Sequence, residues 1–248
     1  MYFVDTYIHS GLFYDEVNCQ KNDDIIFYLN ECRKIRGTIC DVCCGTGRVT
    51  IPLAQNGINI KGFDQSPSMI DEAKEKSIDA NINVDLKVAD LLNYSCKEKF
   101  DGVICTFNSL QYFYTNEEIG CAFTNIKKLL YEDGYFIFDV FNPSIKKMAN
   151  INEALHKQYV RQDGTKVSIY ERNEYFADNQ VLRTIWTIKE NDKQIRECIL
   201  DARCFFPKEI EVILRYYGFI IISKWGDFNY SEFSSNSSKQ VIVARKIG

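Results

Sequence analysis

The sequence predicts an α/β fold, in which an antiparallel β-sheet is inserted into a doubly wound, mostly parallel sheet. Apolar strand-like runs alternate with helix-forming segments from residue 38 to 142, a rhythm typical of parallel sheets covered by helices. Strand-like alternation broken by turn signals fills residues 157–205. A helix and two strands then end the chain, so we expect the antiparallel segment to be an insertion.

The parallel part begins with two strand–helix units. Residues 38–42 form a short apolar strand, and residues 46–56 form the helix that follows it. Residues 58–64 are the second strand. Ser66 and Pro67 then supply an N-cap and a proline at the first helical position, which predicts a helix to about residue 77.

Three further strands complete the parallel part, at residues 84–88, 101–105 and 134–141. Between the last two, the Thr-Asn-Glu-Glu sequence at 115–118 is a capping box, which predicts a helix to about residue 130.

The inserted part is strand-rich. Alternating runs at 166–170 and 181–187 are flanked by Asp-Gly, Asp-Asn and Asn-Asp turn signals, which predicts three or four antiparallel strands. A helix at 207–217 and strands at 219–225 and 240–246 follow.

These elements predict two parts in one chain. We expect a main domain of residues 1–142 and 206–248, and an inserted subdomain of residues 143–205 that covers the functional site as a lid.

Composition excludes some classes of function. Thirty Lys and Arg against 34 Asp and Glu give a net charge of −4, and no run of basic residues exceeds two, which argues against a nucleic-acid partner. No segment approaches the length of a membrane span, and the first residues do not resemble a signal peptide. The expected location is the cytoplasm, without membrane association.

Ten cysteines raise the question of a metal site. Cys40 and Cys43 form a C-x-x-C pair, but no second pair exists and His9 and His156 are the chain's two histidines. Structural zinc needs four ligands at set spacing. We therefore expect no metal and interpret the cysteines as small buried side chains in a reducing compartment.

The most informative motif lies at residues 41–47, Asp-Val-Cys-Cys-Gly-Thr-Gly. A strand that ends in a two-glycine turn and leads into a helix lets backbone N–H groups approach a ligand. Asp41 is poorly placed beside a pyrophosphate but well placed beside an ammonium. A dinucleotide fingerprint would have glycine where Thr50 stands, although Asp64 lies at a suitable distance for a ribose. A tight turn without a ligand is the remaining alternative.

This motif resembles the D/E-x-x-x-G-x-G first motif of class I methyltransferases that depend on S-adenosylmethionine (SAM), and matching features continue to about residue 142. The resemblance implies a seven-stranded, Rossmann-like sheet whose last strand is antiparallel. It also implies SAM as the cofactor and S-adenosylhomocysteine as its product.

The resemblance implies a role for each strand end along the sheet. Asp41 faces the ammonium of SAM through the loop, Asp64 accepts the ribose hydroxyls, and Asp90 accepts the adenine amino group. Met69 and Phe107 would make apolar contacts. The full predicted cofactor set is Tyr14, Asp41, Cys43, Cys44, Gly45, Gly47, Asp64, Gln65, Met69, Asp90, Leu91 and Phe107.

Residues 106–112 stand where such enzymes place the transferable methyl and the acceptor. The sequence Phe-Asn-Ser-Leu at 107–110 lacks the (D/N)-P-P-(Y/F) of enzymes that methylate DNA amino groups or protein glutamine. This difference argues against those two substrate classes. Asn108, which offers a neutral polar group at this position, is predicted as a catalytic residue.

A wider resemblance covers nearly the whole chain. Phe138–Pro143, the strand-rich insertion, Phe205–Pro207 and Trp225–Phe228 are similar to glycine N-methyltransferase and to antibiotic amino-sugar N,N-dimethyltransferases. In those enzymes an N-terminal segment folds over the cofactor and brings a tyrosine to the methyl, which here implies Tyr7 or Tyr14.

The remaining N-terminal candidates have alternatives. Tyr7 is expected either to approach the methyl or to fix the N-terminus to the core. His9 is predicted as a base, because imidazole titrates near neutral pH, and a solvated position is its alternative. His156 is a weaker candidate. The predicted catalytic set is Tyr7, His9 and Asn108.

The predicted function is transfer of a methyl group from SAM to a small-molecule acceptor by in-line displacement, with an amine nitrogen favoured. The alternatives are O-methylation, methylation of RNA or protein, and non-catalytic binding of SAM or a nucleotide. The acceptor's identity stays open, and the chain is expected to be a monomer or homodimer.

Overall fold

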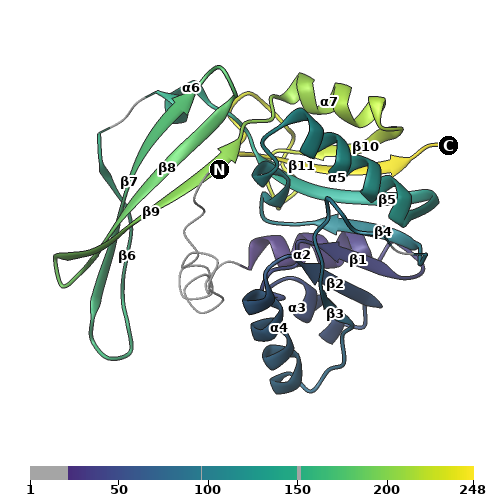
Figure 1. The fold of residues 1–248 in the computed structure, drawn as a ribbon, viewed down its shortest axis with the longest axis horizontal. Coiled ribbons are helices and arrows are strands. Elements are labelled where there is room, and N and C mark those ends of the chain that lie inside the picture. Colours follow the sequence, from purple (N-terminus) through teal and green to yellow (C-terminus); the bar gives the residue numbers. More distant parts are fainter. Residues whose placement is uncertain (1–21, 96, 150–151) are drawn as a thin grey trace. The chain divides into compact units, whose positions relative to one another are not determined.

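The computed structural model describes residues 22–95, 97–149 and 152–248. By internal contacts these residues form two compact units, one of residues 22–142 and 205–248 and the other of residues 143–204 (Figure 1). Each unit is described separately below.

A seven-stranded sheet forms the larger unit, in the order β10-β11-β5-β4-β1-β2-β3. Strand β11 pairs antiparallel with both β5 and β10, and the other pairs are parallel. The predicted mostly parallel sheet with an antiparallel last strand is thereby confirmed. The strands are β1 (Ile39–Val42), β2 (Ile60–Asp64), β3 (Leu86–Val88), β4 (Phe100–Cys105), β5 (Leu130–Phe141), β10 (Phe219–Trp225) and β11 (Lys239–Lys246).

Helices cover both faces of this sheet (Figure 1). Side chains of α5 and α7 pack on one face, and side chains of α2 and α3 pack on the other. The predicted caps are present, because the Ser66 hydroxyl accepts from the Met69 N–H and Thr115 and Glu118 form a complete capping box. The helical elements are α2 (Asp23–Cys32), α3 (Thr50–Gln55), α4 (Pro67–Asp79), the 3₁₀ turn η1 (Ser109–Tyr112), α5 (Asn116–Leu129) and α7 (Pro207–Tyr216).

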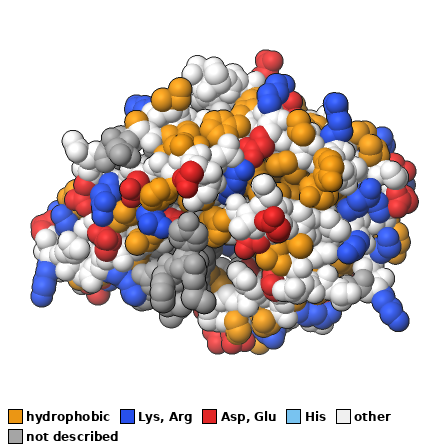
Figure 2. Space-filling model, turned by 45° about the horizontal axis from the view of Figure 1, so that its top comes forward, with side chains coloured by type: hydrophobic (Ala, Val, Ile, Leu, Met, Phe, Trp, Pro, Cys, Tyr) orange, Lys and Arg blue, Asp and Glu red, His pale blue; other side chains and the backbone are white. Residues whose placement is uncertain are grey.

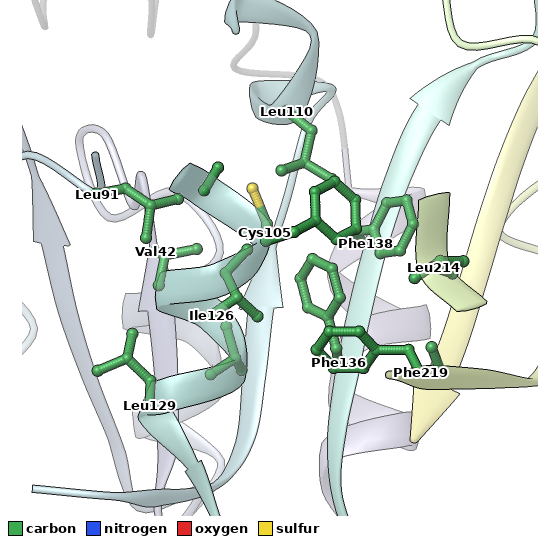
Figure 3. Close-up of a cluster of buried hydrophobic side chains, with 14 of the residues drawn as sticks. Val42, Leu91, Cys105, Leu110, Ile126, Leu129, Phe136, Phe138, Leu214 and Phe219 are labelled. Carbon is green, nitrogen blue, oxygen red and sulfur yellow. The ribbon is translucent and has the colours of Figure 1, made fainter. Parts of the chain in front are cut away.

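The core follows the two-residue period of β5. Phe136 and Phe138 lie in the cluster beneath α5 and α7, whereas Ile137 lies in the cluster on the opposite face. Figure 3 shows Phe136 and Phe138 among side chains from neighbouring strands and helices, including Ile126 and Leu214. Burying a large apolar side chain contributes about 1.5–3 kcal/mol, so this cluster is a main source of the unit's stability.

The smaller unit is an antiparallel sheet of four strands in the order β6-β7-β8-β9, as predicted. Val167, Ile169 and Ile188 are buried, and turns at Gly164 and at Asn191 and Asp192 take positive φ values, as the turn signals required. Its elements are α6 (Ile145–Met148), β6 (Ala154–Val160), β7 (Lys166–Phe176), β8 (Val181–Glu190) and β9 (Lys193–Arg203).

Several predicted boundaries were wrong, and helices α2 and α6 were not predicted. Strand β3 begins at Leu86 rather than at residue 84, and β5 begins at Leu130 rather than at residue 134. The helix expected at 46–56 begins at Thr50, because Gly47 has φ 71° and extends the turn. Strand β2 begins at Ile60 rather than at residue 58. Helix α2 was not predicted, since buried Asp24 and Glu31 interrupt the apolar stripe formed by its buried residues.

The surface carries both signs of charge. On the face in Figure 2, Lys and Arg side chains are interspersed with acidic and apolar ones. Among the residues that the structure describes, no helix combines the length and apolar character that a membrane crossing requires.

Candidate active site

The glycine turn after β1 bends the chain at the carboxyl edge of the sheet. Cys43, Gly45 and Gly47 all have positive φ values, of 61°, 56° and 71°. A Cβ on Gly47 would lie 2.8 Å from Ile51 Cδ1, whereas a Cβ on Gly45 would meet nothing within 4 Å. The turn is therefore closely packed beneath Gly47 and open in front of Gly45, where a ligand can approach the backbone.

Asp41 lies beneath this turn and is fully buried. Its Oδ2 accepts a hydrogen bond of 2.6 Å from the Thr50 hydroxyl, and Oδ1 has no hydrogen-bond partner among the described residues. Burial raises the pKa of Asp41 to about 7, although the hydrogen bond from Thr50 opposes the rise. A cation bound in front of the turn would favour the ionised carboxylate, so Asp41 suits a ligand with an ammonium.

Asp64 joins two loops at the end of β2. One carboxylate oxygen accepts from the Gly45 N–H and the other from the Ser66 N–H, both at 2.9 Å. The side chain is half-buried. Each oxygen has a second lone pair, so Asp64 can fix the glycine turn and still accept hydroxyl groups of a ribose.

The next strand end is arranged in a similar way. Asp90, half-buried after β3, accepts from the Leu92 N–H at 2.9 Å and from the Asn93 amide at 2.8 Å. Leu91 and Met69 are buried in the core, and Gln65 is exposed. Asp90 therefore caps a turn, with lone pairs left for a ligand, and the predicted adenine contact of Met69 stays a prediction.

The two cysteines of the turn point into the protein. A hydrogen bond with Cys43, together with burial, raises the pKa of Cys105 on β4. A Cβ on Gly62 would lie 3.0 Å from Cys44 Sγ, so Cys44 packs against β2, and burial raises the pKa of its thiol. At these two positions the turn offers a ligand its backbone.

Arg48 connects three parts of the site. Its guanidinium donates two hydrogen bonds, of 2.9 and 2.6 Å, to the carboxylate of Asp24, which is buried in α2. It also lies over the Phe107 ring, 4.8 Å from the centroid. The glycine turn and the segment after β4 are therefore neighbours.

The segment after β4 has unusual backbone geometry. Phe107 and Asn108 have φ values of 57° and 62°, and positive φ is rare for a large side chain such as Phe107. Such a conformation costs on the order of 1–3 kcal/mol, so surrounding contacts must hold it.

A buried hydrogen-bond network holds this segment. Asp139 on β5, fully buried, accepts from the Phe107 N–H at 2.7 Å and from the Tyr28 hydroxyl at 2.8 Å. Lys239 on β11 donates to Asp139 Oδ2 at 2.5 Å and to Asn108 Oδ1 at 3.0 Å. Burial and the Asp139 charge raise the pKa of Tyr28 well above its ordinary value, so its hydroxyl stays a donor.

The sequence interpretation missed this network, as well as Arg48 and Asp24. One signal was available, because an aspartate within the apolar run of β5 needs a partner when it is buried. The identity of that partner was not available, since Lys239 lies 100 residues further along the chain.

The structure brings most predicted residues to one edge of one unit, but not all. Tyr7, His9 and Tyr14 lie outside the described residues. His156 belongs to the smaller unit, where it stacks on Trp186 and its Nδ1 lies 3.2 Å from Glu171 Oε2. In the described ranges, no three His, Cys, Asp or Glu side chains are grouped so that they could hold a metal ion.

Comparison with known proteins agrees with this geometry. Residues 39–134 match the family described as a methyltransferase domain. A Geobacillus sp. (strain WCH70) protein that bears the name methyltransferase is 27% identical over 210 residues, 84% of each chain. The protein is a SAM-dependent methyltransferase.

Two further similarities concern this methyltransferase's fold and relatives. A SAM-dependent methyltransferase structure from Clostridium acetobutylicum superposes with a TM-score of 0.79 at 19% identity, over 98% of this chain and all of that one. The dTDP-3-amino-3,4,6-trideoxy-alpha-D-glucopyranose N,N-dimethyltransferase of Streptomyces venezuelae is 26% identical over 102 residues, 41% of each chain.

The residues of the methyltransferase's sheet edge fit its cofactor. The buried Asp41 Oδ1, which has no hydrogen bond within the part of the chain that the structure describes, and the open space before Gly45 suit the cationic amino-acid end of SAM. Asp64 and Asp90 would hold the ribose and the adenine. When bound, SAM supplies a methyl group that its sulfonium has already activated.

Proposed function

We propose that this methyltransferase acts on a small-molecule amine and that an amino sugar is the acceptor class to test first. The similarity to the S. venezuelae amino-sugar dimethyltransferase supports the acceptor class. The observation that carries the proposal is the polar set of the sheet edge, where Asp64 and Asp90 offer carboxylates and Asn108 a neutral amide, while the cations Arg48 and Lys239 are each paired with a buried aspartate. That set binds a cationic cofactor without a covalent nucleophile.

In such a reaction the protein positions the cofactor and the acceptor and encloses them. The glycine turn and Asp64 fix the cofactor's place, and the Phe107–Asn108 segment borders the turn through Arg48. Alignment of the two reacting groups and exclusion of water supply the catalysis. An amine acceptor must lose a proton, and Tyr7 and His9 are the proposed groups for that step.

We propose further that residues 143–205 form the inserted subdomain and serve as a lid over the acceptor. Insertion of its four strands between β5 and α7 supports this role, since both of these elements belong to the unit that carries the site. Its aromatic and arginine side chains would then contact the acceptor.

The test is a methylation screen with SAM. The panel contains the dTDP-3-amino sugar named above, simple amines, phenols, RNA and protein, and S-adenosylhomocysteine release and product mass are measured. We expect methyl uptake on the amine of the sugar nucleotide. Uptake by phenols in place of amines would overturn the amine proposal, and its restriction to RNA or protein would overturn the small-molecule proposal.

A further inference from the structure

The side-chain amide of Asn108 has only one possible orientation. Lys239 Nζ lies 3.0 Å from it, and an ammonium carries donors but no acceptor. The atom that faces Lys239 must therefore be the amide oxygen, and the NH₂ group must point the other way. Because Lys239 can only donate, it decides which end of the Asn108 amide is oxygen and which is nitrogen, an assignment that is otherwise ambiguous.

This NH₂ group is available to a ligand. Asn108 is half-buried, and within the described ranges its Nδ2 donates no hydrogen bond. Nδ2 is also absent from the buried polar atoms that lack partners in those ranges, so solvent reaches it. The segment therefore presents a donor at its surface.

The donor lies beside the cofactor's place. Strands β1 and β4 are parallel neighbours, with Asp41 opposite Ile104, so both carboxyl ends reach the same edge of the sheet. The contact between Arg48 and Phe107 joins the glycine turn to the segment directly. Asn108 is the next residue.

The chemistry of a donor restricts what it can recognise. An NH₂ group repels the cofactor's ammonium, and a hydrogen bond to an amine acceptor's lone pair would block its attack. An oxygen is the suitable partner, and the cofactor's amino-acid end offers a carboxylate.

We propose that Asn108 binds the cofactor's carboxylate and that Lys239 is a positioning residue that holds the Asn108 amide in the required orientation. Asp139 completes the arrangement, because it holds Lys239 at 2.5 Å and also accepts from the Phe107 N–H. Asn108 then acts on the cofactor, which differs from the catalytic role that the sequence indicated. Because Asn108 would bind the cofactor and not the acceptor, its role can be tested even if the acceptor proposal fails.

The test is calorimetric titration with two ligands that share the adenosine thioether. S-adenosylhomocysteine carries the amino-acid end, and 5′-methylthioadenosine lacks it. The variants are Lys239→Met, which cannot donate, and Asn108→Asp, which keeps an oxygen toward Lys239 but replaces the NH₂ with oxygen. Asp tolerates positive φ, so Asn108→Asp preserves the backbone.

Lys246→Met is the matched control. Lys246 is another lysine of β11. It is buried, is bonded to Glu132 at 2.8 Å and to the Leu130 carbonyl at 3.1 Å, and has no part in the Asn108 segment. Thermal unfolding of each variant separates a loss of stability from a loss of binding. Lys239→Arg, which keeps donors, should restore part of the binding.

We expect Lys239→Met and Asn108→Asp to weaken S-adenosylhomocysteine binding by about tenfold, the effect of one charge-assisted hydrogen bond. Binding of 5′-methylthioadenosine should not change, and Lys246→Met should bind both ligands normally. Three results would each overturn the inference: unchanged S-adenosylhomocysteine binding in Asn108→Asp, an equal loss for both ligands, or an equal loss in Lys246→Met. If Lys239→Met does not fold, Asn108→Asp and Lys239→Arg carry the test.

Discussion

The carboxyl edge of the large sheet is built in two different ways. On the β1–β2 side, residues close in sequence shape the site, and the Gly45 N–H binds Asp64 across one strand–helix unit. On the β4–β5 side, Tyr28, Asp139 and Lys239 hold the Phe107–Asn108 segment from three distant parts of the chain. The first side depends on backbone conformation above the buried carboxylate of Asp41, and the second depends on a buried ion pair between distant residues, so the two should fail differently when altered.

Removal of the Lys239 charge should have the largest effect on stability. In Lys239→Met the fully buried Asp139 carboxylate loses its counter-ion, which should lower the free energy of unfolding by about 3–5 kcal/mol. The double variant with Asp139→Asn should recover much of this loss, because no buried charge remains. Urea denaturation measures both, and a single variant as stable as wild type would refute the charge-based account of this side.

The Asp41 carboxylate should make stability depend on pH. Its pKa is raised from 3.8 to about 7 in the folded state, so its stabilising contribution is complete below about pH 4 and is lost as pH rises through 7. The loss should be at most about 4 kcal/mol, because bound cations and relaxation oppose it. Asp41→Asn should remove it, and denaturation from pH 4 to 8 should show a flatter profile for the variant.

The two glycines of the turn separate packing from ligand access. Gly47→Ala places a methyl 2.8 Å from Ile51 Cδ1 at φ 71°, which should cost about 2–3 kcal/mol of stability. Gly45→Ala meets no atom and should cost about 1–2 kcal/mol, the cost of positive φ alone. The methyl group of Gly45→Ala projects into the open side of the turn. This variant should therefore lose more S-adenosylhomocysteine affinity than Gly47→Ala for each kcal/mol of stability that it loses. The reverse order in calorimetry would contradict the geometry of the turn.

A helix cap that belongs to neither hydrogen-bond arrangement should have the smallest effect. Thr115→Ala removes the hydroxyl that accepts from the Glu118 N–H at the start of α5, which should cost about 1 kcal/mol. Thermal unfolding should show this small loss, while S-adenosylhomocysteine affinity stays at the wild-type value. A clear change in affinity would contradict the prediction that the Thr115 cap affects stability alone.

The same division explains what could be predicted from the sequence. The alternation of strands and helices and the inserted sheet follow from local patterns, such as the alternation around Phe136 and Phe138 and the turn residues near Gly164. The antiparallel last strand was implied by the resemblance to class I methyltransferases. The cluster of Asp41, Gly45 and Asp64 was predictable because parallel strands end at one edge. The start of α3 was not, since only the structure shows that Gly47 continues the turn.

The β4–β5 side was beyond local patterns. Asn108 was recognised as polar and well placed, but its amide orientation depends on Lys239, 131 residues away. The ion pair of Asp24 and Arg48 likewise joins helix α2, which was not predicted from the sequence, to the glycine turn, which was predicted. Long-range partners of buried charges become known only when the chain is folded.

The central claim is that this edge binds SAM, and S-adenosylhomocysteine calorimetry on wild type and Asp64→Ala tests it most directly. Asp85→Ala, a substitution of an exposed aspartate near β3, serves as the control. We expect wild type and Asp85→Ala to bind equally and Asp64→Ala to lose at least about tenfold in affinity, since its bond to the Gly45 N–H and the proposed contact with the ribose are removed. A folded wild type that does not bind, or an Asp64→Ala variant that binds as tightly as wild type, would contradict the account.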